Sequence, residues 1–330
     1  MGQYPTPGQN QRPDAVGLTL RGVQFVTLGT DDVVVKRGVT EVRLGLPGLS
    51  AALERIGALA DGTRNEEDLV AVFELDDQPQ IRRLVSALRS RGLLRPDGPD
   101  DPAGAFWQTM APFASEPIAR LAAATVLVLG VGAVADATAA ALIASGVGAV
   151  TRSAEAPALA AAAEPEPPAA IWCVASESPS ARATLLAAAT AALRSGMVLL
   201  PVWLEDLVIR VGPMTYPYDT ACLQCLLLRL DANDPQRDVH RRLRAVIGDG
   251  VAGAGHLPPM TSIAGQVAAT EIVKQLAGLP VSCVGHVIEL GLVPYRSDVR
   301  RVLRVPRCPL CSGIADRGAP VVAHVSQLAE

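Results

Sequence analysis

The sequence predicts an α/β protein in which a Rossmann-type unit follows a small α+β domain. Residues 125–129 (TVLVL) form an apolar run that is typical of a strand buried on both faces. The spacing G-x-G-x-x-A follows at Gly130, Gly132 and Ala135, and a helix-forming run then continues to residue 145. Ahead of this unit, β-prone runs and then three helical patterns occupy residues 18–97.

The glycine motif has two interpretations. Its small residues allow a tight turn and leave the N–H groups at the start of the helix facing a possible phosphate. The same spacing also occurs in turns that only pack a strand against a helix. Gly146-Val147-Gly148 continues the pattern after the helix and makes it more specific. Gly130, Gly132 and Ala135 are therefore candidate nucleotide-binding residues.

Composition and charge bound the possible functions. The 330 residues carry a formal net charge of −4, which gives no support for a strongly basic nucleic-acid binder. No run reaches about 18 uninterrupted apolar residues, the length that a membrane helix needs. The polar start, MGQYPTPGQNQRPD, has no apolar signal core. We expect a cytoplasmic protein without membrane contact, with residues 1–17 disordered.

The first domain, residues 18–97, is expected to contain strands followed by helices. Gly, Asp and Arg-Gly turns separate three β-prone runs at 23–28, 31–38 and 40–46. Helical patterns follow at 49–59, 64–73 and from 77 or 78 to 91, with a short closing strand at 93–95. Thr63 and Glu66 fit a capping box for the second helix. The third helix has one apolar stripe, and the whole order is typical of a winged-helix-type domain.

Residues 98–104 are rich in Pro, Asp and Gly and predict a linker. The second domain is expected to span 105–315, with a tail at 316–330. We expect helices at 105–124, 181–195, 241–246 and 262–277, and strands at 171–175, 197–203, 206–211 and 283–292. Prolines in the Ala-rich stretch 154–170 exclude a long helix there.

Four of the six cysteines form two C-x-x-C pairs, at Cys222 and Cys225 and at Cys308 and Cys311. Four thiolates from two tight turns can surround one zinc ion tetrahedrally, and a filled coordination sphere makes such a zinc structural. The alternative is two redox-active or incidental pairs. The remaining Cys173 and Cys283 lie in apolar strand patterns and are expected to be buried and inert.

Residues 105–315 resemble the ThiF/MoeB family of adenylating enzymes, which are related to ubiquitin activators. The resemblance rests on LVLGVGAVADATAAALIASGVGAV, LRSGMVLLPVWLEDLVIRVGP, ACLQC, IAGQVAATEIVKQLAG and CPLC, in that order. It implies a Rossmann-like sheet, a structural zinc held by the four cysteines, and commonly a homodimer. The activity it implies is ATP-dependent adenylation of a C-terminal carboxylate.

The sequence departs from the family at the nucleotide positions. Where the family strand ends in ribose-binding acids, this chain has Ala154, Glu155 and Ala156. No basic residue lies between Arg152 and Arg182 to grip a triphosphate. The family's Mg²⁺-placing Asp falls near Glu177, and the region of its thioester or persulfide cysteine contains no cysteine here.

Residues 18–97 also resemble the leader-peptide-recognition domain of ribosomal-peptide modification pathways. That resemblance implies a leader added as a strand beside the third strand and against the third helix. The residues it assigns to the peptide are Val42, Arg43, Leu44, Arg83, Ala87 and Arg91. A solvated helix face explains the arginines equally well. DNA binding is disfavoured because residues 18–97 carry 11 Lys and Arg against 12 Asp and Glu.

Three functions follow for comparison. The favoured hypothesis is a scaffold that binds a leader peptide and presents the substrate to a YcaO-type cyclodehydratase without being an independent catalyst. The second is an active ATP-dependent adenylating enzyme that uses Glu177 and Arg182 with Mg²⁺. The third, a dinucleotide-dependent oxidoreductase, lacks the expected ribose-binding acid.

Overall fold

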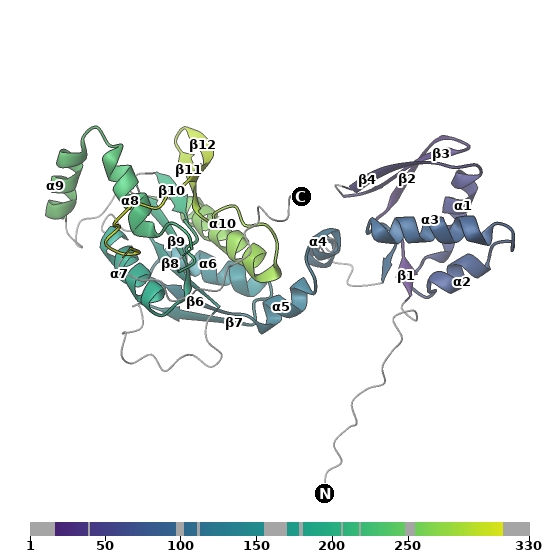
Figure 1. Cartoon of the computed structure of the whole chain (residues 1–330), viewed down its shortest axis with the longest axis horizontal. Coiled ribbons are helices and arrows are strands. Elements are labelled where there is room, and N and C mark those ends of the chain that lie inside the picture. Colours follow the sequence, from purple (N-terminus) through teal and green to yellow (C-terminus); the bar gives the residue numbers. More distant parts are fainter. Residues whose placement is uncertain are drawn as a thin grey trace, which may run out of the picture. The chain divides into compact units, whose positions relative to one another are not determined.

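The computed structural model describes residues 17–38, 40–96, 102–110, 113–154, 170–177, 181–205, 207–217, 219–247 and 255–312. The chain forms two compact units, Met1–Ser115 and Glu116–Glu330, which are described separately (Figure 1). The predicted disordered start, the Ala/Pro stretch that includes Glu155 and Ala156, and the tail at 316–330 lie outside the described residues.

Unit 1 contains the three predicted strands as an antiparallel sheet in the order β2-β3-β4. The strands are β2 (Gln24–Gly29), β3 (Asp32–Arg37) and β4 (Thr40–Gly45). A separate pair joins β1 (Leu18–Thr19) to β5 (Arg95–Pro96), so the predicted closing strand exists but begins two residues later and ends one residue later than expected. This pair ties the beginning of the unit to the segment that follows its third helix.

Three helices follow the sheet of unit 1: α1 (Leu49–Leu59), α2 (Glu66–Ala71) and α3 (Gln78–Ser90). The predicted cap at Thr63 is wrong. The Asp61 carboxylate accepts hydrogen bonds from both the N–H and the hydroxyl of Thr63, which holds this residue in the preceding turn. Asn65 caps α2 instead, in a capping box with Asp68.

The core of unit 1 lies between the sheet and the helices. Val33 and Val35 of β3 are buried there. The predicted apolar stripe of α3 is confirmed, because all four of its side chains are buried: Ile81, Leu84, Val85 and Leu88. Val42 and Leu44 of β4 are partly buried and pack against the same core.

The single helix expected at 105–124 is wrong. The structure has α4 (Pro102–Met110) and α5 (Pro117–Ala123), and α4 begins inside the segment predicted as linker. Proline has no N–H to donate and disfavours helical geometry in the residue before it. Pro117 is the first residue of α5, and Glu116 before it is not right-handed helical but has a left-handed backbone with φ of 48°.

Unit 2 is built on a seven-stranded sheet in the order β12-β11-β10-β9-β8-β6-β7. Four strands are parallel: β6 (Thr125–Leu129), β7 (Ala149–Ser153), β8 (Ile171–Ser176) and β9 (Val198–Glu205). Three antiparallel strands extend the sheet: β10 (Val208–Val211), β11 (His286–Leu292) and β12 (Tyr295–Arg301). The predicted Rossmann-like arrangement is present in the parallel half.

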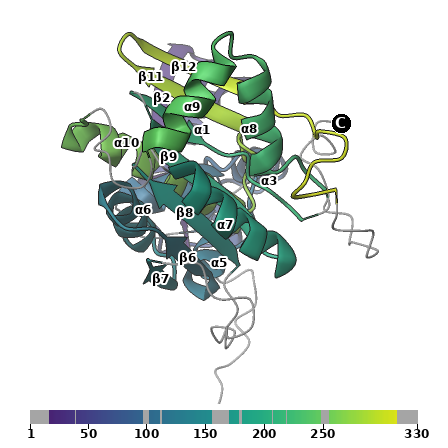
Figure 2. The same ribbon diagram turned by 90° about the vertical axis from the view of Figure 1, so that its left-hand side faces the viewer.

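Helices cover both faces of this sheet (Figure 2). On one face lie α6 (Ala133–Ala144) and α10 (Pro258–Ala277), and on the other α7 (Ala181–Arg194) and α8 (Leu223–Ala232). A further helix, α9 (Arg237–Ile247), lies beyond α8 in Figure 1. No helix in the described part of the chain is both long and apolar enough to cross a membrane.

Two elements of unit 2 were not predicted. The sequence interpretation treated the first C-x-x-C as a tight turn, but Cys225 lies in the first turn of α8. Every residue of β12 is exposed, so this strand lacks the apolar alternation that makes strands recognisable. The remaining predicted helices and strands of unit 2 are present with shifted ends.

Gly265 allows α10 to approach α6 closely. A Cβ atom at Gly265 would lie 2.6 Å from Ala137 Cβ and 2.7 Å from the Thr138 nitrogen. We therefore expect Gly265→Ala to lower the free energy of unfolding by about 1–3 kcal/mol through overpacking. Urea denaturation of the full chain measures this loss.

Gly57→Ala is the matched control, because Gly57 also lies in a helix. Its added Cβ would meet only the Phe25 ring, at 3.6 Å, which is ordinary contact. Alanine has a higher helix propensity than glycine by about 1 kcal/mol, so this variant should be as stable as the wild type or more stable. Stabilisation of both variants would show that the helix contact at Gly265 does not limit packing.

Candidate functional site

Four cysteine sulfurs meet inside unit 2. The Sγ atoms of Cys222, Cys225, Cys308 and Cys311 all lie within 4.8 Å of one another, and all four residues are buried. Three Sγ–Sγ distances are each 3.7 Å: Cys222 to Cys225, Cys222 to Cys308, and Cys225 to Cys311. These distances are far longer than the ~2.05 Å of a disulfide bond. The four cysteines of the two C-x-x-C pairs therefore lie together, as predicted, and form no disulfide bond.

The spacing of the sulfurs suits a tetrahedral metal ion. With metal–sulfur bonds of about 2.3 Å, the edge of a regular tetrahedron is ~3.8 Å, close to the observed separations. Four thiolates this close repel one another, and a divalent cation at their centre removes that repulsion. The four cysteines could thus hold a metal ion.

Each half of the cluster is positioned differently. Cys222 is the N-cap residue of α8, and Cys308 and Cys311 lie in the turns that follow β12. Hydrogen bonds from the Cys222 thiol and the Val305 N–H lower the pKa of Cys225 to about 4. Burial raises the pKa of Cys311 to about 11. The same hydrogen bond raises the pKa of Cys222, so within this pair the Cys222 thiol is the donor and the Cys225 sulfur the acceptor.

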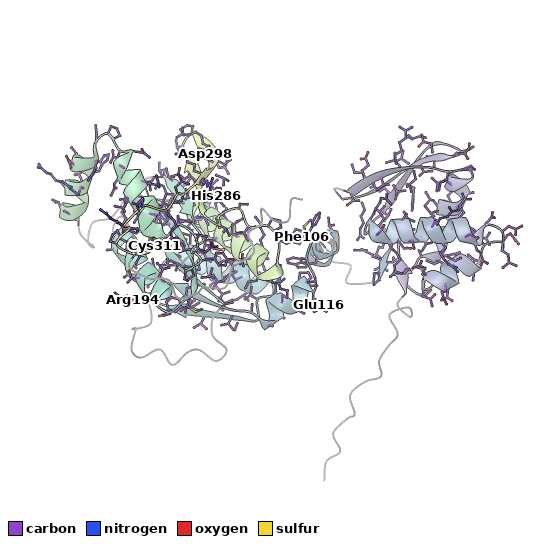
Figure 3. All side chains as sticks on the ribbon, viewed as in Figure 1. Phe106, Glu116, Arg194, His286, Asp298 and Cys311 are labelled. Carbon is purple, nitrogen blue, oxygen red and sulfur yellow. The ribbon has the colours of Figure 1, made fainter. Side chains whose placement is uncertain are left out.

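A second contact holds the same two segments together. Arg229 of α8 donates hydrogen bonds to the carbonyl oxygens of Leu303 (2.7 Å) and Arg304 (3.3 Å). Side chains from α7, α8 and the sheet form one core with the four cysteines. The cluster lies on the face of the sheet that α7 and α8 cover (Cys311 is labelled in Figure 3).

The glycine loop at the start of α6 is occupied by a side chain of the protein itself. The Glu177 carboxylate accepts hydrogen bonds from the N–H groups of Ala133 (2.6 Å) and Val134 (3.2 Å). A Cβ atom at Gly132 would lie 2.0 Å from Glu177 Oε1, and one at Gly130 would lie 2.1 Å from the Ala175 carbonyl oxygen. Both glycines therefore accommodate the end of β8, and the helix-terminal N–H groups already bind an anion.

The other residues predicted at the nucleotide site are buried, paired with acidic side chains, or not acidic themselves. Ala135 is buried in α6. Arg182 donates a hydrogen bond to Asp231 (2.8 Å) and lies 3.9 Å from Glu205. Ala154 follows β7 at the position where the family has an acidic residue. Arg152, on β7, forms an ion pair with Asp136 of α6.

Arg182 belongs to a chain of alternating charges that the sequence interpretation missed. Glu205 also pairs with Arg210 (3.5 Å), and Arg210 donates to Glu289 (2.7 Å). Glu205 and Arg210 belong to the consecutive strands β9 and β10, whereas Arg182 lies on α7 and Glu289 on β11. Single charged residues in these elements are a weak sequence signal, since only the strand order brings Arg182 and Glu289 to the same chain of contacts.

In unit 1, β4 is an edge strand. Within the described residues its only strand partner is β3. Val42 and Leu44 face the core, whereas Arg43 lies on the opposite face and forms a bidentate ion pair with Asp32 (2.9 and 2.5 Å). The three predicted peptide-binding residues of β4 therefore lie on two faces of the sheet, because Arg43 does not share a face with Val42 and Leu44.

The α3 members of that set lie on the helix surface. Arg83 and Arg91 are exposed, and each donates a hydrogen bond to a carbonyl oxygen one turn earlier, of Pro79 and Ala87. Ala87 is half-buried. These two arginines keep their charge available at the surface.

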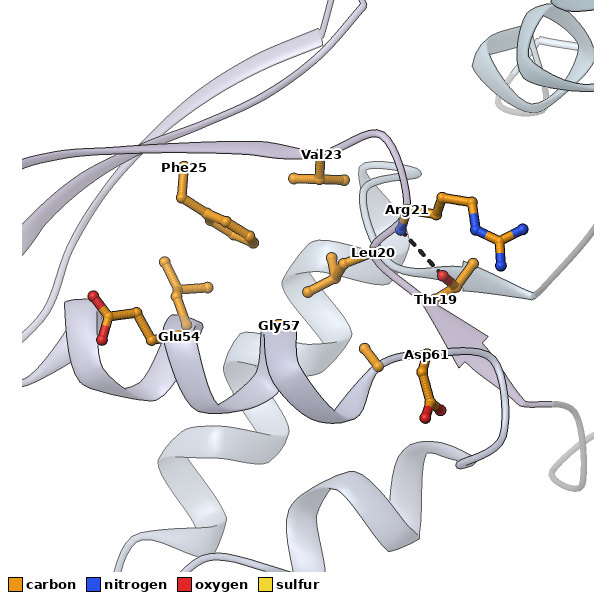
Figure 4. Close-up of a pocket in the computed structure, with 10 residues that line it drawn as sticks. Thr19, Leu20, Arg21, Val23, Phe25, Glu54, Gly57 and Asp61 are labelled. Atoms are coloured by element: carbon orange, nitrogen blue, oxygen red, sulfur yellow. Dashed lines mark hydrogen bonds between the residues drawn. The ribbon is translucent and has the colours of Figure 1, made fainter. Parts of the chain in front are cut away.

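Two hollows lie in unit 1. One, of about 270 Å³, lies between the end of β4 and the first turns of α1 and α3, where Leu46, Ala52, Arg55, Phe73 and Ile81 line it. The other, of about 510 Å³, lies between β2 and α1 and has no lining residue from β4 or α3 (Figure 4). There Val23 and Phe25 face Gly57, and Glu54 and Asp61 stand at the rim.

Comparison with known proteins identifies the fold but not a family. No family model matches the sequence, and no curated protein matches it. The structure of the heterocyclase TruD matches with a TM-score of 0.66 and 20% identity, over 90% of this chain and 43% of its own. A heterocyclase in complex with substrate and cofactor matches with a TM-score of 0.66 and 22% identity, over 90% and 39%.

A third similar structure is E. coli MccB with AMPCPP and MccA, with a TM-score of 0.62 and 13% identity, over 89% of this chain and 99% of MccB. At these identities the likeness concerns the fold. It supports the ThiF-like fold that the sequence resemblance implied. The chain spans about two-fifths of the length of the two heterocyclases. The winged-helix description of unit 1 stays a prediction.

We expect Cys308→Ser to lower the metal content of the purified protein from about one ion per chain to nearly none, because three thiolates leave the site open. The turns after β12 should then become sensitive to protease. Elemental analysis and limited proteolysis of the same samples measure both effects. Cys173→Ala, a buried cysteine outside the cluster, is the control and should keep its metal. Equal metal contents would contradict a site at the four sulfurs.

We also expect Glu177→Ala to lower the free energy of unfolding by about 0.5–2 kcal/mol, since two N–H groups of α6 lose their acceptor. Glu177→Gln should lose less, because its amide oxygen can still accept. Chemical denaturation of the full chain compares the two variants. An unchanged midpoint in Glu177→Ala would show that the carboxylate does not cap α6 in solution.

Proposed function

We propose that this chain is a peptide-binding, ThiF-like component of a ribosomal-peptide modification pathway. It binds the leader segment of a precursor through unit 1 and presents the substrate to a YcaO-type cyclodehydratase. The observation that carries this proposal is the edge of β4 that no other described strand pairs with, in a strand whose Val42 and Leu44 pack against the same core as α3. An independent catalytic centre in this chain is not part of the proposal.

A leader peptide binds here by extending the sheet. An extended segment pairs its backbone with β4, and its alternate side chains face Val42, Leu44 and the half-buried Ala87. Arg83 and Arg91 then attract acidic residues of the leader. Arg43 contributes on the outer face of the strand, where it is paired with Asp32.

The structural neighbours support a role of this kind. One is a heterocyclase whose complex holds substrate and cofactor, and another is MccB bound to MccA. Because this chain spans about two-fifths of the heterocyclases, the proposal assigns heterocycle formation to the partner enzyme. We expect this chain to act as a homodimer.

The metal in this proposal is a structural zinc. Four thiolates fill the tetrahedral sphere of zinc and leave no position for a water or a substrate. Such an ion would hold Cys222 and Cys225 of α8 against Cys308 and Cys311. Its role is to keep the strands and turns near the end of unit 2 folded onto the core.

ATP and Mg²⁺ have no role in the proposal. A triphosphate would have to displace the Glu177 carboxylate from the start of α6, and the nearest predicted arginine, Arg182, already pairs with Asp231 and Glu205. Breaking the contacts of Glu177 and Arg182 costs free energy, and this cost offsets part of the free energy that phosphate binding would supply. The adenylating alternative would need both groups to be released.

Calorimetric titration of the full chain with precursor peptides encoded beside it tests the peptide-binding role. We expect binding to the leader segment, weakened at least tenfold by the double variant Arg83→Glu/Arg91→Glu, because it reverses two charges at the site. Arg194→Glu, an exposed arginine of unit 2, is the charge-matched control (labelled in Figure 3). Absence of leader binding by the wild type would overturn the proposal.

ATP–pyrophosphate exchange tests the catalytic alternative. With Mg-ATP and a bound precursor, we expect no exchange above the background of protein-free samples. Exchange that disappears in the Glu177→Ala and Arg182→Ala variants would instead establish adenylation. The leader titration on the same preparation shows whether the protein is competent to bind.

A further inference from the structure

α9 has an apolar stripe that the described part of the chain does not cover. Val239, Leu243 and Val246 are spaced by four and three residues, so they lie along one side of the helix. Their exposed fractions are 55%, 49% and 83%. Figure 1 places α9 at the end of unit 2, beyond α8. An amphipathic helix gains stability by burying such a stripe, and here the stripe faces solvent.

The rest of α9 is strongly basic. Its sequence, RDVHRRLRAVI, contains four arginines and one acidic residue, whereas the whole chain has a net charge of −4. Arg241 pairs with Asp238 at 3.1 Å, and both side chains are more than half exposed. His240 lies 2.6 Å from Asp234, which ties the first turn of α9 to the segment between α8 and α9. The positive charge is therefore local and lies next to the apolar stripe.

We propose that α9 is a docking helix for a protein partner that surrounds an apolar groove with acidic side chains. The groove takes Val239, Leu243 and Val246, and the acidic rim pairs with Arg237, Arg241 and Arg242. A membrane surface fits less well, because membrane-surface helices combine basic residues with Trp, Phe or Leu, and α9 has one leucine and no aromatic residue. The inference rests on the proposed function, within which this partner is the modifying enzyme that receives the peptide.

Binding of the full chain to the cyclodehydratase encoded beside it, measured by surface plasmon resonance, tests the inference. We expect Val239→Ser/Leu243→Ser and Arg241→Glu/Arg242→Glu each to weaken binding at least tenfold. The charge-reversed variant should also lose most of the salt dependence of the association rate. Ile143→Ser and Arg194→Glu change an exposed apolar residue and an exposed arginine elsewhere in unit 2, and they should bind like the wild type.

Each other outcome overturns the inference. Wild-type protein that does not bind the enzyme, or α9 variants that bind it normally, would exclude docking through this helix. The same holds if the α9 variants lose self-association, or lose binding to vesicles of phosphatidylserine and phosphatidylcholine, while they bind the enzyme normally. Thermal unfolding of all variants confirms that these exposed changes leave the fold intact.

Leader binding on the same samples separates the two proposals. If the leader binds and the enzyme binds independently of α9, the docking helix is wrong and the peptide-binding function stands. If the leader does not bind, the proposed function fails whatever the α9 variants do.

Discussion

The contact between the turns after β6 and β8 is the constraint on which unit 2 depends. Gly130 lies against the Ala175 carbonyl, and Gly132 lies against the Glu177 carboxylate, so neither position can carry a side chain without moving the neighbouring strand end. The same closeness lets Glu177 bind the N–H groups at the start of α6. A glycine motif that serves phosphate binding elsewhere serves here to bring a carboxylate to the helix. In the proposed function, this contact is the role of the glycine motif in place of phosphate binding.

The two units contribute different properties to the proposed function. In unit 2, helices cover both sheet faces, the side chains from Arg182 to Glu289 pair with one another, and four cysteines meet inside the core. Unit 1 offers an edge strand, the exposed arginines of α3 and two hollows. A division between a rigid body and an open recognition surface suits a protein that positions a peptide for another enzyme. The exposed apolar stripe of α9 is the exception in unit 2, and in our proposal it is the surface through which this unit binds a partner.

Local patterns in the sequence predicted most of the fold. The apolar run at 125–129, the stripe of α3 and the two C-x-x-C pairs each depend on neighbouring residues, and all three were found where expected. The errors have equally local causes. Pro117 begins a second helix within the range 105–124 that was expected to be one helix. Thr63 donates its hydrogen bonds to Asp61 and therefore does not cap α2. The role of Glu177 and the charge chain from Arg182 to Glu289 could not be predicted, because they depend on which strands lie side by side. The cysteine cluster also joins segments 86 residues apart, but it was predictable because two C-x-x-C pairs are typical of one four-cysteine metal site.

The sulfur cluster also sets an order of events during synthesis. Cys222 and Cys308 are 86 residues apart, so at 5–20 residues per second a ribosome needs roughly 4–17 s to complete the site after its first half has emerged. During that interval α8 carries two unpartnered thiols, and β11 and β12 have yet to join the sheet. In a nascent chain, α8 therefore cannot be joined to the second cysteine pair until β11 and β12 have been made and the sheet of unit 2 is complete. The speed of translation therefore decides how long the half-built cluster stays open to oxidation.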